Sequence, residues 1–593
     1  MIGPGTLKIL HSATLICAVC LAGLPATTCV AQDDQPQRPN VIIFLMDDMG
    51  YGDLHALNPE GCGIPTPHLD QLVADGVVFR HAHSPAAMCS PSRYSLLTGN
   101  YCFRGRRTTG TWDVFEPGQI LQGQRTIADM LRGHGYSTAF FGKYHLGGEF
   151  YRKEGSLADS FGEADLTLPF SNGPLDHGFD ESWTLPSGIQ ASPAAFFKND
   201  RLARWDNAER KYEYEPKFTY FQSDEKAREC FVARTWLRDE NAWIMDNWNV
   251  ESVGPLLMNR ALHYIDKHNQ RFGNSRPFFM HYCSQAGHAP YAPPVSFNAS
   301  EPMNTEDVSV EGAIAVRGQA ITNRTDMIVE GDVAIGLLIN KLRQLDLLDN
   351  TLIIFTSENG VAKGRNSHWD NPVFNDRLDG PYGGNRIEVS AEGARKHVNG
   401  QGIGVGGQPL RGKKGQVYEG GHRVPLVFRW GASIPGGRTI DSQIIGLNDV
   451  YRTVAHLVGA EVAADAALDS VDFSAVLLNA DLPAELVRDE LFVLSNRPSE
   501  DPTSPADGKA WAAYYCESGG DNFQLWKSVI VTSMDADDRI KSSRPKELYD
   551  LTADPGELAQ VDHPGMQELI HQRFTAVLQS ARTTESARAR SSR

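Results

Sequence analysis

The chain has 593 residues, 41% of them hydrophobic and 22% charged, and its formal net charge at pH 7 is −17. A single hydrophobic core stops growing at about 250–300 residues, so this length predicts one large domain and a smaller one. The acidic balance excludes bulk attraction to nucleic acid or to an anionic membrane, and an anionic substrate therefore needs a local basic pocket.

Residues 1–31 have the features of a secretory signal peptide. Lys8 is their only charged residue, and the stretch from Ile9 to Leu24 is apolar apart from small polar residues. A membrane anchor is less favoured, because a spanning helix needs a longer apolar run of about 20 residues. A lipoprotein signal ending at Cys29 is also less favoured, because the residues before that cysteine do not match such a signal well. We predict export to the periplasm or the cell exterior, with a mature chain that begins near Gln32 and has no membrane span.

Further along the chain, four apolar runs stop abruptly at polar residues. They are NVIIFLMDD at 40–48, STAFFGKYH at 137–145, PFFMHYCSQAGH at 277–288 and TLIIFTSEN at 351–359. Runs this apolar, without alternation, are typical of strands buried on both faces of a parallel sheet. Helical patterns at 67–77, 126–135 and 332–348 lie between them. Strands that alternate with helices predict an α/β architecture.

The carboxyl ends of parallel strands meet at one edge of a sheet, where ligands bind in such folds. This rule gathers the polar residues that end the four runs: Asp47, Asp48, Lys143, His145, His288, Glu358 and Asn359. A single acidic pair after a strand is more often a turn or a helix cap, but the coincidence in four strands favours a site. The acids and the amide offer only oxygen ligands, which favours a hard cation, Ca²⁺ or Mg²⁺, over zinc.

The segment AMCSPSRYSLLTG at 87–99 combines a cysteine with the signals of a helix start. Ser90 is the expected N-cap and Pro91 the first helical residue, which puts Arg93 one turn from Cys89 on the same side. A helix N-terminus beside an arginine suits a bound anion. The plain alternative for Cys89 is a buried thiol, the commonest role of a free cysteine.

Cys89-Ser90-Pro91-Ser92-Arg93, followed by Leu97-Thr98-Gly99, resembles the signature of type I sulfatases, in which the cysteine is oxidised to Cα-formylglycine. GYSTAFFGKYH at 135–145 resembles the second signature of that family. PLDHGFD, LRGKKGQVYEGGHRVP and ELYDLTADPGE resemble further landmarks, and all five segments follow the family's order.

The resemblance implies the alkaline phosphatase-like fold. This is an α/β fold with a large, mixed, mostly parallel sheet flanked by helices, and a smaller C-terminal α+β domain that carries an antiparallel sheet. We place the catalytic domain at 38–480 and the C-terminal subdomain at 481–593. The implied partners are a sulfated small molecule or saccharide as substrate and a formylglycine-generating enzyme that acts on Cys89 during maturation.

The resemblance also assigns the site. The implied ligands of one divalent cation, Ca²⁺ before Mg²⁺, are Asp47, Asp48, Glu358, Asn359 and the residue formed from Cys89. Glu358 stands where the family usually has aspartate, so its longer side chain keeps the charge but can shift the cation. The implied catalytic set is Cys89, Arg93, Lys143, His145, His288 and Lys414, and Ser187 is a looser match to a further site serine.

In the implied mechanism, one hydroxyl of the hydrated aldehyde attacks sulfur while the metal and Lys143 neutralise the sulfate oxygens. His288, with Lys414, protonates the departing alcohol. His145 then deprotonates the second hydroxyl, which expels sulfate and restores the aldehyde. A serine has no second hydroxyl and would stay trapped as its sulfate ester.

The sequence therefore predicts an exported sulfatase that acts on sulfate monoesters, with sulfated carbohydrate favoured over an aryl ester by the tryptophans and arginines of the inserts. Two alternatives stay open. A phosphate or phosphonate ester hydrolase of the same superfamily commonly uses threonine or serine and often two zinc ions, but the extra metal ligands are lacking. An inactive carbohydrate-binding relative would not need the intact catalytic set.

Other polar and aromatic residues have plainer interpretations. The cysteines after the signal are too irregularly spaced for a disulfide framework. Structural roles are favoured for the histidines His81, His83 and His422, and core packing is favoured for the tryptophans Trp205, Trp236, Trp243 and Trp248. The Gly-rich connection at 361–410 is favoured as a substrate-specificity loop over an idle insertion.

Overall fold

The computed structural model describes residues 38–203, 218–221, 242–245, 248–297, 313–362 and 410–591, except for gaps at 60–61, 113, 161, 192, 290, 321, 481–484, 496–508, 518–522 and 536–539. The predicted signal peptide and most of the 361–410 connection lie outside these residues. Residues 38–593 belong to one unit, and 1–37 to another. Within the described ranges, no helix combines the length and apolar character that crossing a membrane requires.

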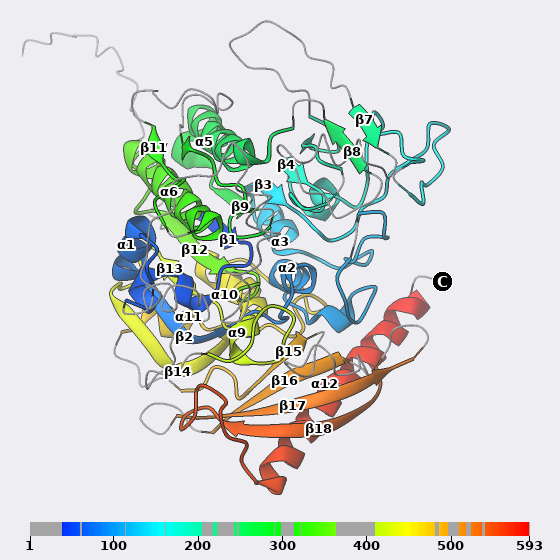
Figure 1. The fold of residues 1–593 in the computed structure, drawn as a ribbon, viewed down its shortest axis with the longest axis vertical. Coiled ribbons are helices and arrows are strands. Elements are labelled where there is room, and N and C mark those ends of the chain that lie inside the picture. Colours follow the sequence, from blue (N-terminus) through cyan, green and yellow to red (C-terminus); the bar gives the residue numbers. More distant parts are fainter. Residues whose placement is uncertain are drawn as a thin grey trace, which may run out of the picture. The chain divides into compact units, whose positions relative to one another are not determined.

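A ten-stranded sheet, in the order β14-β2-β13-β12-β1-β9-β3-β4-β5-β6, forms the centre of the fold (Figure 1). Its strands are β1 (Asn40–Met46), β2 (Val77–His83), β3 (Ser137–Lys143), β4 (Glu181–Leu185), β5 (Phe197–Lys198), β6 (Arg201–Leu202), β9 (Phe278–Cys283), β12 (Thr351–Ser357), β13 (Leu426–Arg429) and β14 (Arg438–Gly446). β12, β1, β9, β3 and β4 are parallel neighbours, whereas β13 is antiparallel to β12 and β2. The four apolar runs are therefore adjacent strands, and the predicted mixed, mostly parallel sheet is confirmed.

Both faces of the sheet are covered. On β1, Val41, Ile43 and Leu45 belong to one hydrophobic core, and the residues between them belong to the other, all with no exposed surface. The first core includes side chains of α2 (Cys89–Thr98), α3 (Ile127–Gly133) and α10 (Val450–Val458). The second includes side chains of α1 (Pro67–Asp75), α5 (Val253–Phe272) and α6 (Asn323–Gln344) (Figure 1). Burial on both faces explains why these strands are apolar without alternation.

Shorter elements complete the larger part of the fold. They are the helices α9 (Glu419–His422) and α11 (Ser474–Leu478) and the strand pairs β7 (Phe218–Phe221) with β8 (Ala242–Met245) and β10 (Ser296–Phe297) with β11 (Ile314–Ala315). Of these, α9 matters for the site, because it directly follows the segment that carries Lys414.

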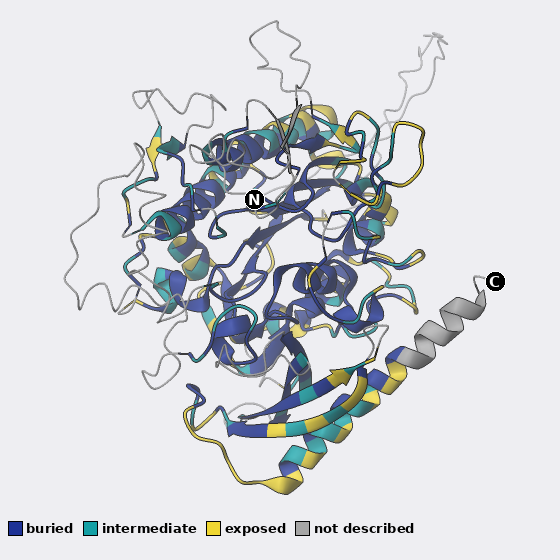
Figure 2. Ribbon diagram, turned by 45° about the vertical axis from the view of Figure 1, so that its right-hand side comes forward, coloured by how far each residue is buried: buried dark blue, intermediate teal, exposed yellow. Residues whose placement is uncertain are grey.

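The C-terminal part of the chain forms a separate antiparallel sheet, as predicted. It consists of β15 (Glu490–Ser495), β16 (Lys509–Glu517), β17 (Gln524–Met534) and β18 (Ile540–Asp550), and the last helix is α12 (Pro564–Ser591). Trp511 of β16 packs against Phe574 of α12, with ring centroids 5.5 Å apart, and both belong to the core that also includes α2 and α10. Buried residues therefore continue from the central sheet into this one (Figure 2). The domain boundary at 480/481 stays a prediction.

Candidate active site

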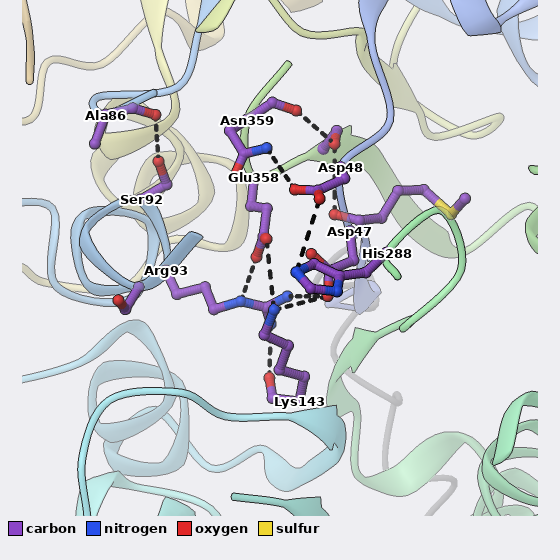
Figure 3. Close-up of polar contacts among 12 residues, drawn as sticks. Asp47, Asp48, Ala86, Ser92, Arg93, Lys143, His288, Glu358 and Asn359 are labelled. Carbon is purple, nitrogen blue, oxygen red and sulfur yellow. Dashed lines mark hydrogen bonds and ion pairs between the residues drawn. The ribbon is translucent and has the colours of Figure 1, made fainter. Parts of the chain in front are cut away.

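The parallel strands bring the predicted residues to one edge of the central sheet. The positions are Asp47 and Asp48 after β1, Lys143 at the end of β3, His288 in the loop after β9, and Glu358 and Asn359 after β12. Figure 3 shows these side chains pointing toward one another, together with that of Arg93 from α2. The four distant segments thus meet at one edge of the sheet, as the carboxyl-end rule predicts.

Arg93 is a buried cation inside this group. Arg93 is 2% exposed. Its Nη1 donates a hydrogen bond of 2.6 Å to the Lys143 carbonyl, and its Nε is ion-paired with Glu358. Its Nη2 lies 3.8 Å from Asp47 Oδ2. Arg93 therefore neutralises buried carboxylates and supports the end of β3.

Lys143 lies between two carboxylates. Its Nζ donates to Asp47 Oδ2 at 2.8 Å and lies 3.8 Å from Glu358 Oε1, and none of its side chain is exposed. Burial lowers the pKa of Lys143, but the neighbouring groups, of which Asp47 has the largest effect, together outweigh burial and raise it, so the ammonium stays charged. Against the opposing effect of burial, Lys143 in turn holds the pKa of Asp47 well below its usual range.

Asp48 joins the remaining predicted residues. Its Oδ1 accepts hydrogen bonds from Lys414 Nζ at 2.5 Å and from Asn359 Nδ2 at 2.8 Å, and its Oδ2 lies 3.7 Å from His288 Nε2. Its backbone has φ 58°, in the left-handed region that is uncommon outside glycine. Such strained residues cluster at functional sites, where surrounding contacts hold them in place.

The oxygen atoms of this edge fit a hard cation. Asp47 Oδ1 and Asn359 Oδ1 are buried without a hydrogen-bond partner among the described residues, and the Glu358 carboxylate has ion pairs but no hydrogen bond. Asp47, Asp48 and His288 each place a ligand-type atom within 4.8 Å of the others. Burial, with the charge of Asp47, raises the pKa of Glu358 well above its usual range despite the nearby Arg93. A divalent cation would relieve this crowding and satisfy the unpaired oxygens.

Cys89 stands beside these charges. It is 4% exposed, and it lies close enough to Lys143, Lys414 and Arg93 to interact with them electrostatically. Because α2 approaches the carboxyl edge of the sheet, the cysteine, the lysines and the metal-type oxygens all belong to one site.

The predicted start of the helix that carries Cys89 is wrong. The helix begins at Cys89 itself, with Met88 as the N-cap, and no side chain caps it. Ser90 lies inside the helix, where its Oγ accepts a hydrogen bond of 3.2 Å from the Trp112 backbone, and Pro91 is the third helical residue. A tertiary contact thus uses the hydroxyl that local capping preference assigns to the helix end.

His145 lies just beyond β3 with a strained backbone, at φ 56°. It is 6% exposed, and its Nδ1 has no hydrogen-bond partner among the described residues. Burial, together with the positive charges of Lys143 and Arg93, lowers its pKa well below the ordinary value. The imidazole is therefore neutral.

Gln190 is a buried neighbour of the site that no motif singles out. Its Nε2 donates to the Ser187 carbonyl at 2.9 Å, and its Oε1 has no hydrogen-bond partner in the described structure. A Cβ on Gly188 would lie 2.7 Å from that oxygen and 2.8 Å from the Lys143 side chain. The turn that contains the loosely matched Ser187, itself 2% exposed, therefore packs on Lys143.

The other sequence interpretations have mixed outcomes. Trp205, Trp236 and Cys230 lie outside the described residues, and Trp243 is a residue of β8. Trp248 is 6% exposed, as core packing requires. The thiols of Cys62, Cys89, Cys283 and Cys516 are free and buried, which agrees with the predicted lack of a disulfide framework in this part of the chain.

A mixed sheet with these charged residues at its carboxyl edge defines an ester hydrolase of the alkaline phosphatase superfamily. The sequence model of the sulfatase family matches residues 39–460. The chain therefore belongs to the sulfatase family and is a sulfuric ester hydrolase, which confirms the resemblance found in the sequence.

Known relatives agree with this assignment. An N-acetylgalactosamine-6-O-sulfatase of Bacteroides thetaiotaomicron is 28% identical over 570 residues, 92% of this chain and 94% of the relative. An N-acetylgalactosamine-6-sulfatase of Sus scrofa is 27% identical over 455 residues, 75% of this chain and 67% of the relative. A solved structure described under glycosaminoglycan metabolism by B. thetaiotaomicron has a TM-score of 0.64 at 23% identity, and the match covers 92% of this chain and 100% of that one. That structural likeness supports the fold.

Proposed function

We propose that this protein releases sulfate from a sulfated carbohydrate, with formylglycine made from Cys89 as nucleophile and one bound Ca²⁺. The observation that carries the proposal is the meeting of Cys89 with two lysines, the fully buried Lys143 and the partly exposed Lys414, at an edge that holds unpaired carboxylate and amide oxygens. Hydrated formylglycine would supply a hydroxyl that attacks sulfur. A formylglycine-generating enzyme is the maturation partner that this chemistry requires.

The proposed cation ligands are Asp47, Asp48, Glu358, Asn359 and the modified residue 89. When bound, the cation would supply positive charge against the sulfate oxygens and orient the ester. An oxygen-only set favours Ca²⁺, or Mg²⁺, over zinc. Arg93 and Lys143 hold Asp47 and Glu358 in place, because both cations contact these carboxylates, and Lys143 favours the ionised form of Asp47.

The proposed proton transfers follow from the positions of the two histidines. Neutral His145 can take a proton from residue 89. His288 Nδ1 donates to the Ala289 carbonyl at 2.5 Å, and burial lowers the pKa of His288 to about 4, so Nε2 of the neutral ring must first take up a proton before it can pass one to the leaving oxygen. Lys414, whose side chain is 20% exposed, would assist this protonation of the leaving oxygen from its position beside Asp48.

The two alternatives are less well supported. A phosphate ester hydrolase is not favoured, because the matching family model and the named relatives are sulfatases. An inactive carbohydrate-binding relative is not favoured either, since the described residues retain the complete predicted catalytic set. Parallel assays on an aryl sulfate and an aryl phosphate distinguish all three, and turnover of only the phosphate would overturn the proposal.

Carbohydrate is the proposed substrate class because relatives that cover most of this chain are named for N-acetylgalactosamine 6-sulfate. The test is a panel of sulfated monosaccharides and oligosaccharides, including N-acetylgalactosamine 6-sulfate, with released sulfate as the readout. We expect kcat/KM for at least one saccharide to exceed that for an aryl sulfate by about tenfold or more, since sugar contacts add transition-state binding. An aryl sulfate preferred over every saccharide would contradict the substrate class.

A further inference from the structure

A buried charge cluster joins the C-terminal sheet to the segment that carries Lys414. Lys527 of β17 contacts Glu419 Oε1 at 3.1 Å and Glu557 Oε1 at 2.6 Å, and the side chains of the lysine and of Glu419 are 0% exposed. The second oxygen of Glu557 accepts a hydrogen bond of 2.8 Å from the Glu419 backbone. Tyr514 of β16 donates its hydroxyl hydrogen bond to Glu419 Oε1. The start of α9 is thus held by three residues of the C-terminal region.

The loop before α9 is tied to that helix. The Gly420 backbone donates to the Arg411 carbonyl at 2.6 Å, which closes the loop that contains Lys414. A Cβ on Gly420 would lie 2.4 Å from the Gly412 carbonyl oxygen, and one on Gly421 would lie 2.3 Å from that of Gln416. Backbone contact this close leaves room only for glycine at positions 420 and 421. We therefore expect a movement of Glu419 to displace the loop that contains Lys414.

The same sheet also contacts the segment before Cys89. The Ala87 backbone donates to the Leu494 carbonyl of β15 at 2.7 Å, and Ser495 Oγ donates to the Gly415 carbonyl at 2.7 Å. Gly415 in turn donates to the Ala87 carbonyl at 2.6 Å. The end of β15 therefore contacts both the segment before Cys89 and the segment that carries Lys414.

From these contacts we propose that Lys527 and Glu557 are positioning residues for Lys414, acting through Glu419. The inference rests on the proposed role of Lys414 in sulfate ester hydrolysis. Lys414 Nζ must stay beside Asp48, 2.5 Å from Oδ1, while the leaving oxygen is protonated. A shift of about 1 Å in such a group can lower the rate up to about 100-fold.

A metal site is the competing interpretation of this cluster. His83, Glu419 and His422 place ligand-type atoms within 4.8 Å of one another, and the Nδ1 atoms of the histidines are 3.2 Å apart. However, Glu419 is already balanced by Lys527 and by Arg423, whose Nε lies 3.6 Å from Oε2. A divalent cation would add charge beside two buried cations, so the histidines are better described as a hydrogen-bonded neutral pair.

The test is a double-mutant cycle on formylglycine-containing protein, with kcat measured on an aryl sulfate. Lys527→Met combined with Glu557→Gln removes one charge of each sign and leaves Glu419 with Arg423 and Tyr514. We expect this pair to lower kcat about tenfold in the natural sequence but less than about twofold in a Lys414→Ala background. An equal fold-loss in both backgrounds would overturn the proposal, because the pair would then act through general stability.

Further variants keep the test decisive. Tyr514→Phe removes one hydroxyl and no charge, so it repeats the cycle if the double variant fails to fold. Arg573→Met is the matched control: it removes ion pairs of the same region, with Asp489 at 2.7 Å and Glu490 at 3.3 Å, at the opposite end of β15 from Ser495, and should leave kcat unchanged. If Lys414→Ala itself leaves kcat unaltered, the proposed role of Lys414 fails, which is distinguishable from a lack of coupling.

Discussion

We expect residue 89 to determine whether the protein can turn over a sulfate ester. We predict that active protein carries an aldehyde there, so peptide mass spectrometry should find a loss of mass relative to the thiol, and a hydrazide should label that peptide alone. Cys89→Ala should abolish turnover yet cost only about 1 kcal/mol of stability, because the buried side chain loses one atom. Full turnover by protein with an unmodified thiol would contradict the mechanism.

Cys89→Ser separates attack on sulfur from release of sulfate. A serine hydroxyl beside Lys143 and Lys414 can attack once, but it has no second hydroxyl with which to expel the product. We expect a peptide heavier by one sulfate group after incubation with substrate. Repeated turnover by the serine variant would show that the second hydroxyl is unnecessary.

Glu358→Gln tests the cation. The amide keeps the size of the side chain but removes a charge that faces both Arg93 and Lys143. We expect kcat to fall on the order of 100-fold, with a smaller loss of stability, since no large cavity forms. Elemental analysis of the natural protein should find one calcium ion per chain, and two zinc ions would favour a phosphatase instead.

At the scale of elements, α6 carries a carboxyl that makes stability depend on pH. Glu330 is 2% exposed and accepts a hydrogen bond of 2.7 Å from Gln285 Nε2, and burial raises its pKa to about 8. Between the ordinary value near 4.5 and about 8, the folded protein binds a proton that the unfolded chain does not, so stability falls as pH rises.

The Glu330→Gln variant should abolish this contribution. We expect its free energy of unfolding, relative to the natural protein, to rise by about 2–4 kcal/mol between pH 5 and pH 8.5, measured by chemical denaturation. Glu568→Gln on the exposed face of α12 is the control and should give no such difference. A constant difference between Glu330→Gln and the natural protein at all pH values would contradict the assignment.

The strands of the central sheet were predictable, whereas the exact start of α2 was not. Residues 41–46 are buried on both faces, and burial of that kind leaves a strong pattern in the sequence. The start of α2 depends on what Ser90 contacts, and Trp112 lies 22 residues away. A capping rule that uses only neighbouring residues cannot predict a contact with Trp112.

At the scale of the whole molecule, we predict export. N-terminal sequencing of protein recovered outside the cytoplasm should find a first residue near Gln32. Exported protein with an intact Met1 would contradict the prediction.

Long-range contacts also limit what sequence reasoning finds in the site. The polar residues at strand ends could be predicted from the carboxyl-end rule alone. Lys527, in contrast, is a single lysine in a strand with no motif around it, and its partner Glu419 is 108 residues away. Gln190 likewise has no motif, since its place beside Lys143 depends on tertiary packing.

The contacts of Asp48 have a consequence for the order of events during synthesis. Its partners Asn359 and Lys414 lie 311 and 366 residues away along the chain. At about 5–20 residues per second, the first half of the site waits on the order of 20–70 s for the second. For that interval Cys89 belongs to an unfinished chain, whereas in the finished fold its residue is 4% exposed. An enzyme that converts this cysteine would therefore have a limited time in which to act, and the fraction of active protein would then depend on the relative rates of modification and folding.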